Sequence, residues 1–413
     1  MAATPEVLGL KRSFGFGDRL GLATPGHIDA LRGSGFAPIF AQQSIREMTR
    51  TKRTPDEVMR AAVQALAQEK WSGAWGADAD HLQTPEDVVR TAKEGFTFFT
   101  IDPSAHVNKE ADALSLDALK AAQAQLVARG DVSATGARDL YLGKSFDLPG
   151  GQSLKFDDET ALLRAEVKYG AALMHTARLY GTIQGACGGK PFEVEMSVDE
   201  TPSPTSPIEH LFIGLELRRQ GVKLVSLAPR FVGEFEKGID FKGDLKLFEA
   251  HYRVHVAIAK HCGPYKLSVH SGSDKFTIYP IVARLSGELL HVKTAGTSYL
   301  EALRVAARVD KPFFRELIGF CRGRYDTDKA TYHVSAKLSD VPADPADADL
   351  ERLYLDLDSG RQILHVTFGA VLGGEHGKPP YKGRLLDLLH KRADLYREVL
   401  AIHLGKHLKL LQS

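Results

Sequence analysis

A strand–helix–strand pattern between residues 222 and 276 limits the possible fold of this chain more than any other feature. Apolar residues alternate with other residues in two short runs, near 224 and 266, and this period of two predicts β-strands. The segment between them, 244–262, has apolar residues at helical spacing. Each run ends in a cluster of polar residues. Such units predict a parallel α/β fold with functional residues at the strand ends.

The same alternation of strands and helices recurs along the chain. We predict eight strands, near residues 37, 74, 97, 193, 224, 266, 289 and 363. Eight units predict an α/β fold of the (β/α)8, TIM-like barrel type, forming a single domain over residues 1–413. Residues 1–35 are rich in glycine, and we expect them to be irregular. Their GFGDRLG run departs from the dinucleotide fingerprint, so we expect no nucleotide site there.

Residues 103–190 interrupt this rhythm after the third predicted strand. The segments 115–129 and 158–180 have amphipathic helical patterns, and Gly-, Asp- and Ser-rich connections join them. Loops at the carboxyl ends of strands tolerate such insertions and often become lids. We therefore predict a helical insertion, or lid, over 103–190. A second polar excursion is expected over 322–358.

Composition and charge exclude several classes of protein. The hydrophobic and charged contents, 43% and 25%, are ordinary for a soluble globular protein. A net charge of +1 favours neither nucleic acid nor a membrane surface as a partner. Three distant cysteines fit a reducing compartment, and no apolar run resembles a signal peptide or a membrane span. We expect a cytoplasmic protein with a small-molecule substrate; the sequence does not predict its oligomeric state.

Polar residues follow most of the predicted strands, and in a closed barrel they would meet at one mouth. Imidazoles and carboxylates from separate strands are the usual ligands of a divalent metal, and open coordination positions can hold substrate oxygens. The other polar side chains at the mouth are candidates for substrate binding. The candidate residues are Gln42, Gln43, Asp80, His81, Glu195, Asp199, Glu200, Arg230, Glu234, Glu236, His270, Asp274, Lys275, Lys293 and Thr294.

Each candidate also has a purely structural interpretation. Asp80 and His81 could form a polar turn before a helix, and a lone histidine such as His270 is usually a core or turn residue. Glu234 or Glu236 could pair with a nearby cation on the surface. Glu195, on the barrel-facing side of its strand, needs a partner, because burying an unpaired carboxylate costs several kcal/mol.

Seven blocks of the sequence, in order, resemble the tagaturonate epimerase family, whose relatives also include 4-epimerases of the neutral ketoses tagatose and fructose. The blocks run from about residue 13 to residue 304. They are GFGDRLGLATPGH, FAQQSIREMTRT, WGADADHL, SVDET, RFVGEFEKGID, HSGSDKF and HVKTAGTSYLEALR. The resemblance implies an isomerase, a carbohydrate epimerase that uses a divalent metal ion, with zinc expected first and manganese, nickel or cobalt as alternatives.

The resemblance also implies roles for individual residues. Asp80 would be the proton acceptor, and Glu195 or Asp199 the proton donor. His81, His270 and Glu236 (or Glu234) would bind the metal. Substrate contacts would come from the remaining side chains at the mouth, with a cation holding the carboxylate if the substrate is a uronate. These are Gln42, Gln43, Arg230, Glu234, Asp274, Lys275, Lys293 and Thr294.

The implied reaction inverts the hydroxyl-bearing carbon β to a keto group. Because that C–H bond is not acidified by the carbonyl, we expect deprotonation of the hydroxyl, retro-aldol cleavage, rotation of the aldehyde and re-addition. The alternatives are a metal-dependent aldolase acting on a keto sugar acid, which would release the fragments, and a sugar-binding barrel without catalysis. Tagaturonate or fructuronate and tagatose or fructose remain equal candidates for the substrate.

Overall fold

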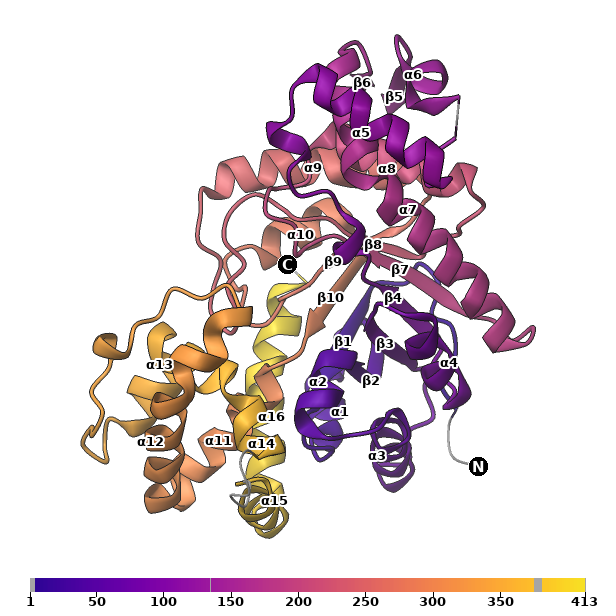
Figure 1. Cartoon of the computed structure of the whole chain (residues 1–413). Coiled ribbons are helices and arrows are strands. Elements are labelled where there is room, and N and C mark those ends of the chain that lie inside the picture. The colour runs from indigo at the N-terminus through magenta and orange to yellow at the C-terminus, as the bar shows by residue number, and fades with distance from the viewer. Residues whose placement is uncertain (1–3, 134, 375–380, 413) are drawn as a thin grey trace.

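The computed structural model describes residues 4–133, 135–374 and 381–412. Eight parallel strands in the described part form a closed barrel, in the order β1-β10-β9-β8-β7-β4-β3-β2 (Figure 1). The strands are β1 (Ser13–Gly17), β2 (Ala37–Ser44), β3 (Gly76–Leu82), β4 (Phe98–Ile101), β7 (Glu193–Ser197), β8 (Ser226–Ala228), β9 (Lys266–Val269) and β10 (Leu290–Thr294). The predicted α/β barrel is confirmed.

The sequence analysis predicted one strand that is not present and missed one that is, so the predicted number of barrel strands was still eight. The run near 363 is the helix α13 (Asp358–Val366), and the missing strand is β1, inside the segment expected to be irregular. All residues from 360 to 366 of α13 are buried, so the helix lacks the polar face that would have shown its period. In β1, a Cβ on Gly15 would lie 2.4 Å from the Gln42 side chain, so this glycine serves close packing between strands.

Most helices surround the barrel, and several start at strong sequence signals. Thr54, Thr84 and Ser206 each accept a hydrogen bond from the backbone three residues on, and a proline follows each of them. The surrounding helices are α1 (Thr24–Leu31), α2 (Ile45–Thr51), α3 (Pro55–Gln68), α4 (Pro85–Lys93), α7 (Glu159–Cys187), α8 (Pro207–Arg219), α9 (Leu245–Cys262), α10 (Tyr279–Ser286), α11 (Thr297–Val309) and α16 (Ala393–Leu410).

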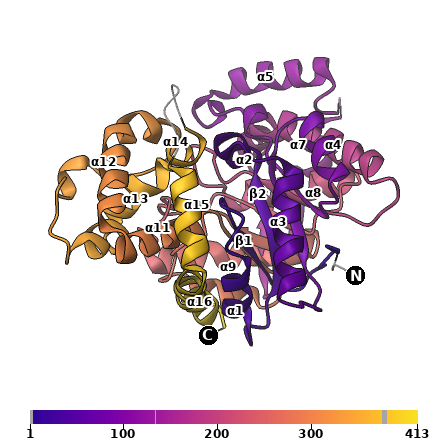
Figure 2. The same cartoon turned by 90° about the horizontal axis from the view of Figure 1, so that it is seen from below.

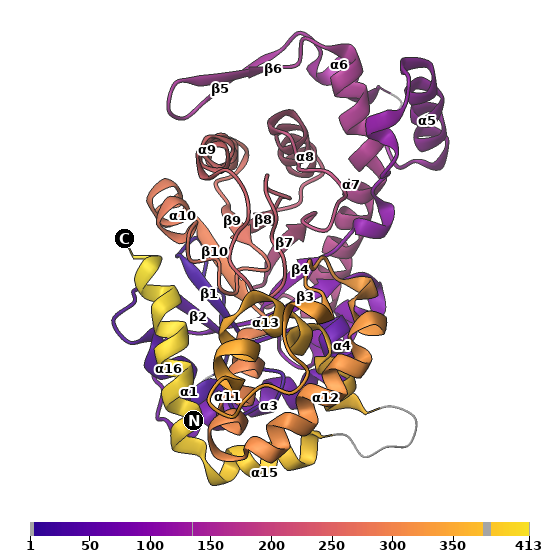
Figure 3. The same cartoon turned by 90° about the vertical axis from the view of Figure 1, so that its left-hand side faces the viewer.

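The predicted insertion follows β4, which is the fourth strand because β1 precedes the first predicted one. It contains α5 (Leu116–Arg129), α6 (Gly136–Tyr141) and a hairpin of β5 (Ser145–Leu148) and β6 (Gln152–Lys155), with short 3-10 turns at Ser104–His106 and Ala111–Ala113. α7 packs on α4 and α8 and completes the ring of helices. Figures 1 and 3 show α5, α6 and the hairpin at one end of the molecule, beyond α7, α8 and α9.

The C-terminal third adds a helical layer on one side of the barrel, seen from below in Figure 2. It contains α12 (Lys311–Asp328), α13, α14 (Phe368–Gly373) and α15 (Lys382–Lys391), with short turns at Lys329–Thr331, Leu338–Asp340 and Arg352–Asp356. The last helix, α16, packs on α1 and α11 and so joins the two ends of the chain. No helix of the described residues is both long and apolar enough to span a membrane.

Candidate active site

A buried lysine organises the carboxyl end of the barrel. Lys293, on β10, places Nζ 2.7 Å from Asp78 Oδ2, 2.8 Å from Asp80 Oδ1 and 2.9 Å from Glu195 Oε1. It also donates to the Thr100 hydroxyl, at 2.5 Å. All of these side chains are buried. The single charge of the Lys293 ammonium cannot neutralise three carboxylates. Because buried unpaired charges are costly, we expect further positive charge, or a proton, at this cluster.

Two histidines stand over this group, and each uses one ring nitrogen to contact a carboxylate. His81 Nδ1 lies 2.9 Å from Asp80 Oδ1, and His270 Nε2 lies 2.6 Å from Glu195 Oε1. Their other ring nitrogens face Asp199, at 4.0 Å from His81 Nε2 and 3.5 Å from His270 Nδ1. The ring centroids are 5.2 Å apart. Segments far apart in sequence thus bring two imidazoles and a carboxylate to one point.

The local backbone explains how Asp80 and His81 reach the same side of the barrel. Neighbouring residues of a strand normally point to opposite faces. His81 has a left-handed φ of 56°, and the register between β3 and β4 shifts between Ala79 and Leu82. Left-handed backbone is unfavourable for a residue with a side chain and is concentrated at functional sites. The irregular backbone therefore lets both side chains join the cluster.

The electrostatics of the cluster favour charged histidines. Burial would lower the pKa of His81, but the Asp80 carboxylate outweighs it and raises the pKa to about 10. Burial and Lys293 oppose the charge on His270, yet Asp199 and Glu195 raise its pKa to about 9. A divalent cation binds where it can replace such protons, since metal ligands must be deprotonated.

The carboxylates divide into two kinds. Burial would raise the pKa of Asp80 and of Glu195, but the neighbouring cations hold both well below the ordinary range. Burial prevails at Asp78, whose pKa rises to about 7 despite Lys293. Asp78 can therefore carry a proton near neutral pH while Asp80 and Glu195 stay ionised.

Two adjoining cavities open above the cluster, with volumes of about 80 and 280 Å³. Asp80, His81 and Lys293 line the smaller one, and Arg230 and Glu234 line the larger. The two share the lining residues Asp199, Glu200, Lys237, His270, Ser271 and Tyr332. A concave site of this size, with convergent polar groups, suits a small polar ligand.

The structure brings most of the predicted site residues to this mouth, but not all of them. Nine candidates line a cavity: Gln42, Asp80, His81, Asp199, Glu200, Arg230, Glu234, His270 and Lys293. Glu195 lies beneath them, fully buried, with Oε2 lacking a hydrogen-bond partner among the described residues. Gln43 accepts a hydrogen bond from Arg53, and the Thr294 hydroxyl donates to the Gly15 carbonyl at 2.8 Å.

The Glu236 carboxylate points away from the two histidines. Oε2 accepts hydrogen bonds from Gln362 at 2.6 Å and from the Ser335 backbone and hydroxyl at 2.8 and 2.7 Å. Oε1 lies 3.3 Å from Lys242. The predicted ligand set of His81, His270 and Glu236 is thus not assembled in this structure, because Glu236 holds the C-terminal layer to the loop after β8.

Asp274 and Lys275 also serve contacts other than the mouth. Asp274 pairs with Arg361 at 2.7 Å and with His403 at 2.5 Å. Lys275 donates to backbone carbonyls, including those of Glu236 at 2.8 Å and Ser273 at 3.1 Å. Neither residue lines a cavity. The geometry of the described residues therefore does not support their predicted contact with substrate.

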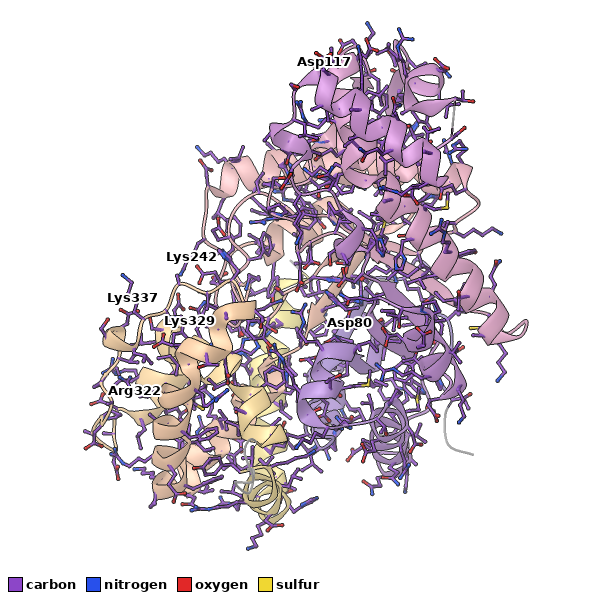
Figure 4. All side chains as sticks on the ribbon, in the orientation of Figure 1. Asp80, Asp117, Lys242, Arg322, Lys329 and Lys337 are labelled. Carbon is purple, nitrogen blue, oxygen red and sulfur yellow. The ribbon has the colours of Figure 1, made fainter. Side chains whose placement is uncertain are left out.

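Several residues of the site were missed by the sequence analysis. Asp78 is two positions before Asp80 on the same strand face, so the period of two could have identified it. Lys237 was considered only as a possible surface partner of Glu234 or Glu236, and Tyr332 comes from the C-terminal layer, where no pattern pointed to the mouth. No described residue of 103–190 lines either cavity. In Figure 4, Asp80 lies centrally and Asp117 of α5 at the far end of the molecule.

Comparisons with known proteins identify the family to which this chain belongs. The family model for tagaturonate epimerase matches residues 1–411. A tagaturonate/fructuronate epimerase of Thermotoga maritima is 43% identical over 411 residues, which cover 99% of this chain and 82% of the relative. The native crystal structure of a fructuronate-tagaturonate epimerase from Cohnella laeviribosi superposes with a TM-score of 0.92 at 37% identity, covering 99% of this chain and 83% of that one.

A glycerol complex of the Cohnella enzyme gives the same TM-score, 0.92, at 36% identity and with the same coverage of both chains. The family model and the Thermotoga relative both extend over almost the whole of this chain, well beyond the residues around the mouth. The chain therefore belongs to the tagaturonate epimerase family, a family of carbohydrate isomerases.

Proposed function

We propose that this chain interconverts tagaturonate and fructuronate by inverting the hydroxyl-bearing carbon β to the keto group. The observation that carries the proposal is the pair of carboxylates, Asp80 and Glu195, that share the Lys293 ammonium below two histidines. The substrates named for the Thermotoga and Cohnella relatives support it.

The residues present fit a divalent metal ion. His81 and His270 each have one nitrogen fixed by a carboxylate, as metal-bound histidines usually do, and the other nitrogen turned toward Asp199. We infer that His81, His270 and Asp199 would hold the ion, with Asp80 and Glu195 orienting the rings. Glu236 would have to leave Gln362 and Ser335 to take part. A bound divalent ion would supply Lewis acidity at the keto oxygen.

The chain's own residues would move the protons. Asp80 lines the smaller cavity and is kept ionised by Lys293 and His81, so it can accept the proton of the β-hydroxyl. The alkoxide then becomes an aldehyde as the C–C bond breaks, and the bonding electrons pass to an enediolate. Lys293, which contacts both carboxylates, offers a path for the proton from Asp80 to Glu195.

Inversion requires that the aldehyde fragment rotate and re-add through its other face. Glu195 lines neither cavity, so it would return the proton to the new hydroxyl through the Lys293 ammonium, which contacts it and lines the smaller cavity, and Asp80 would be regenerated as a base. Both fragments must stay in the site during the rotation. Residues 331–333, together with Phe231 and Phe235, line the larger cavity. We infer that this wall keeps the fragments in the site and limits the access of water.

The test is product analysis by NMR with metal-loaded protein. Tagaturonate and fructuronate should interconvert with no free three-carbon product, and the solvent should not exchange deuterium into the inverted C–H bond. Free three-carbon fragments would instead identify an aldolase, and binding without turnover of either uronate would leave only a sugar-binding barrel. Deuterium at the inverted carbon would reject the retro-aldol route.

A further inference from the structure

Lys237 occupies an unusual position for a cation in this site. It follows β8, is half-buried, and lines both cavities above the cluster. Its Nζ donates to the Ser271 hydroxyl at 2.6 Å, and it forms no ion pair within the described part of the chain. The charge of Lys237 helps to lower the pKa of Asp199, but no carboxylate of the described residues forms an ion pair with it, so this half-buried ammonium at a polar cavity can bind an anion.

The other cations near the mouth are already neutralised. Lys293 is held by three carboxylates, and Arg46 pairs with Glu200 at 3.0 Å. Arg19 pairs with Glu47 at 2.6 Å. Lys275 is enclosed by backbone carbonyls. These four cannot serve a substrate carboxylate without giving up their present contacts.

Arg230 is the second cation of the wall that has no carboxylate partner among the described residues. It lines the larger cavity, and its guanidinium contacts only the Thr201 carbonyl. Lys237 lies where the two cavities meet, and Arg230 lines only the larger one, whereas Asp80 and Lys293 line only the smaller one.

We propose that Lys237, assisted by Arg230, binds the terminal carboxylate of a six-carbon keto-uronate and makes the enzyme prefer sugar acids to neutral ketoses. The inference rests on the proposed function, which places the reacting hydroxyl at Asp80. The substrate's far end then reaches the border of the two cavities. A uronate presents a carboxylate there, whereas tagatose or fructose presents a hydroxymethyl group that cannot neutralise the ammonium.

The experiment compares Lys237→Met with Lys237→Arg in the full-length, metal-loaded enzyme, using tagaturonate and tagatose. In Lys237→Met, the ratio of kcat/KM for tagaturonate to kcat/KM for tagatose should fall about 10- to 100-fold, the range expected for one lost hydrogen bond to a charged group. The fall should appear mainly in KM for the uronate. Lys237→Arg should keep most of the wild-type ratio.

The matched control is Lys246→Met, which removes an exposed lysine of α9 that lines neither cavity and should not change the ratio. An equal fall for both sugars in Lys237→Met would overturn the proposal, because it would mean that Lys237 only positions Ser271 and His270. If Lys237→Met does not fold, Arg230→Gln gives the same comparison, and an unchanged ratio there also counts against the proposal.

Binding gives an independent readout. Galactonate, a sugar acid without a keto group, should bind Lys237→Met about tenfold more weakly than wild type by calorimetry, whereas the neutral polyol galactitol should show no such difference. Equal galactonate affinities would contradict the inference. A wild-type enzyme that converts neither sugar would reject the proposed function itself, so the two failures are distinct.

Discussion

Two groups of one aspartate and two histidines lie in this molecule, and they differ in what their ring nitrogens contact. Asp80, His81 and His270 stand at the barrel mouth; Asp274, His403 and His407 join the loop after β9 to α16. In both, the ligand atoms lie within 4.8 Å of one another. By residue type and distance alone, either group could therefore bind a metal ion.

In the second group, each ring nitrogen has a partner at 3.5 Å or less, and neither histidine lines the cavities at the mouth. His407 Nε2 accepts from the Asp274 backbone N–H at 2.9 Å, and its Nδ1 donates to the His403 carbonyl at 2.9 Å. His403 lies between Asp274 at 2.5 Å and Glu301 at 3.5 Å. At the mouth, by contrast, His81 Nε2 is 4.0 Å from Asp199, and His270 Nδ1 has contacts of 3.4 Å to Ser197 and 3.5 Å to Asp199, and both histidines line a cavity. The comparison separates a group that can bind ligands from a group that holds the fold together.

The largest expected contrast is catalytic. Asp80→Asn should lower kcat for the uronate about 10²- to 10⁴-fold, because it removes the proposed proton acceptor while keeping the shape. Asp274→Asn should change kcat of the folded enzyme less than about threefold, within the usual range for a residue outside the site. Steady-state assays measure kcat for both variants. Similar decreases in kcat would contradict the assignment of only the first group to the active site.

The next contrast concerns stability. Arg361→Met removes the cation 2.7 Å from buried Asp274 and should lower the free energy of unfolding by about 3 kcal/mol, since a buried charge loses its partner. Urea denaturation followed by circular dichroism gives the value. Arg32, whose side chain is 70% exposed, provides the control, and Arg32→Met should cost less than about 1 kcal/mol. A small loss in Arg361→Met would mean that the second group does not stabilise the fold.

Metal affinity distinguishes Asp199 from Glu236 as the third ligand of the ion at the mouth. Asp199→Asn should weaken zinc binding at least about tenfold, because Asp199 faces the ring nitrogens of both histidines that Asp80 and Glu195 do not contact. Glu236→Gln should keep the wild-type affinity, since Gln362 and Ser335 already occupy that carboxylate. Competition with a fluorescent chelator measures both. If Glu236→Gln weakened zinc binding more than Asp199→Asn, Glu236 would be the third ligand, as the sequence predicted.

The smallest expected effect is the pH dependence of the stability that His403 of the second group contributes. Burial opposes the charge on His403, but Glu301 and Asp274 prevail and raise its pKa. A raised pKa stabilises the fold fully below the unfolded value, about 6.5, and the gain is lost as pH rises through the folded value. The stability advantage of wild type over His403→Gln should therefore shrink above pH 6.5. Denaturation at several pH values tests the direction, and a growing advantage would reverse it.

Sequence patterns predicted the barrel because most strands have clear alternation and end in polar residues. They failed at β1, whose glycines serve close packing, and at α13, whose burial on every side hides its period. Asp80, His81, Glu195 and His270 were found because strand ends meet in a barrel. Glu236 and Asp274 follow strands too, but residues of the C-terminal part of the chain engage them, and contacts between distant segments leave no local signal. Lys275 instead donates to backbone carbonyls of the loops after β8 and β9.

Anomalous diffraction from crystals soaked in zinc tests the central claim most directly, because the two groups would give peaks at different places. We predict a peak between His81 and His270, beside Asp199, that disappears in crystals of His270→Gln. A peak between Asp274, His403 and His407, with none at the mouth, would contradict the account.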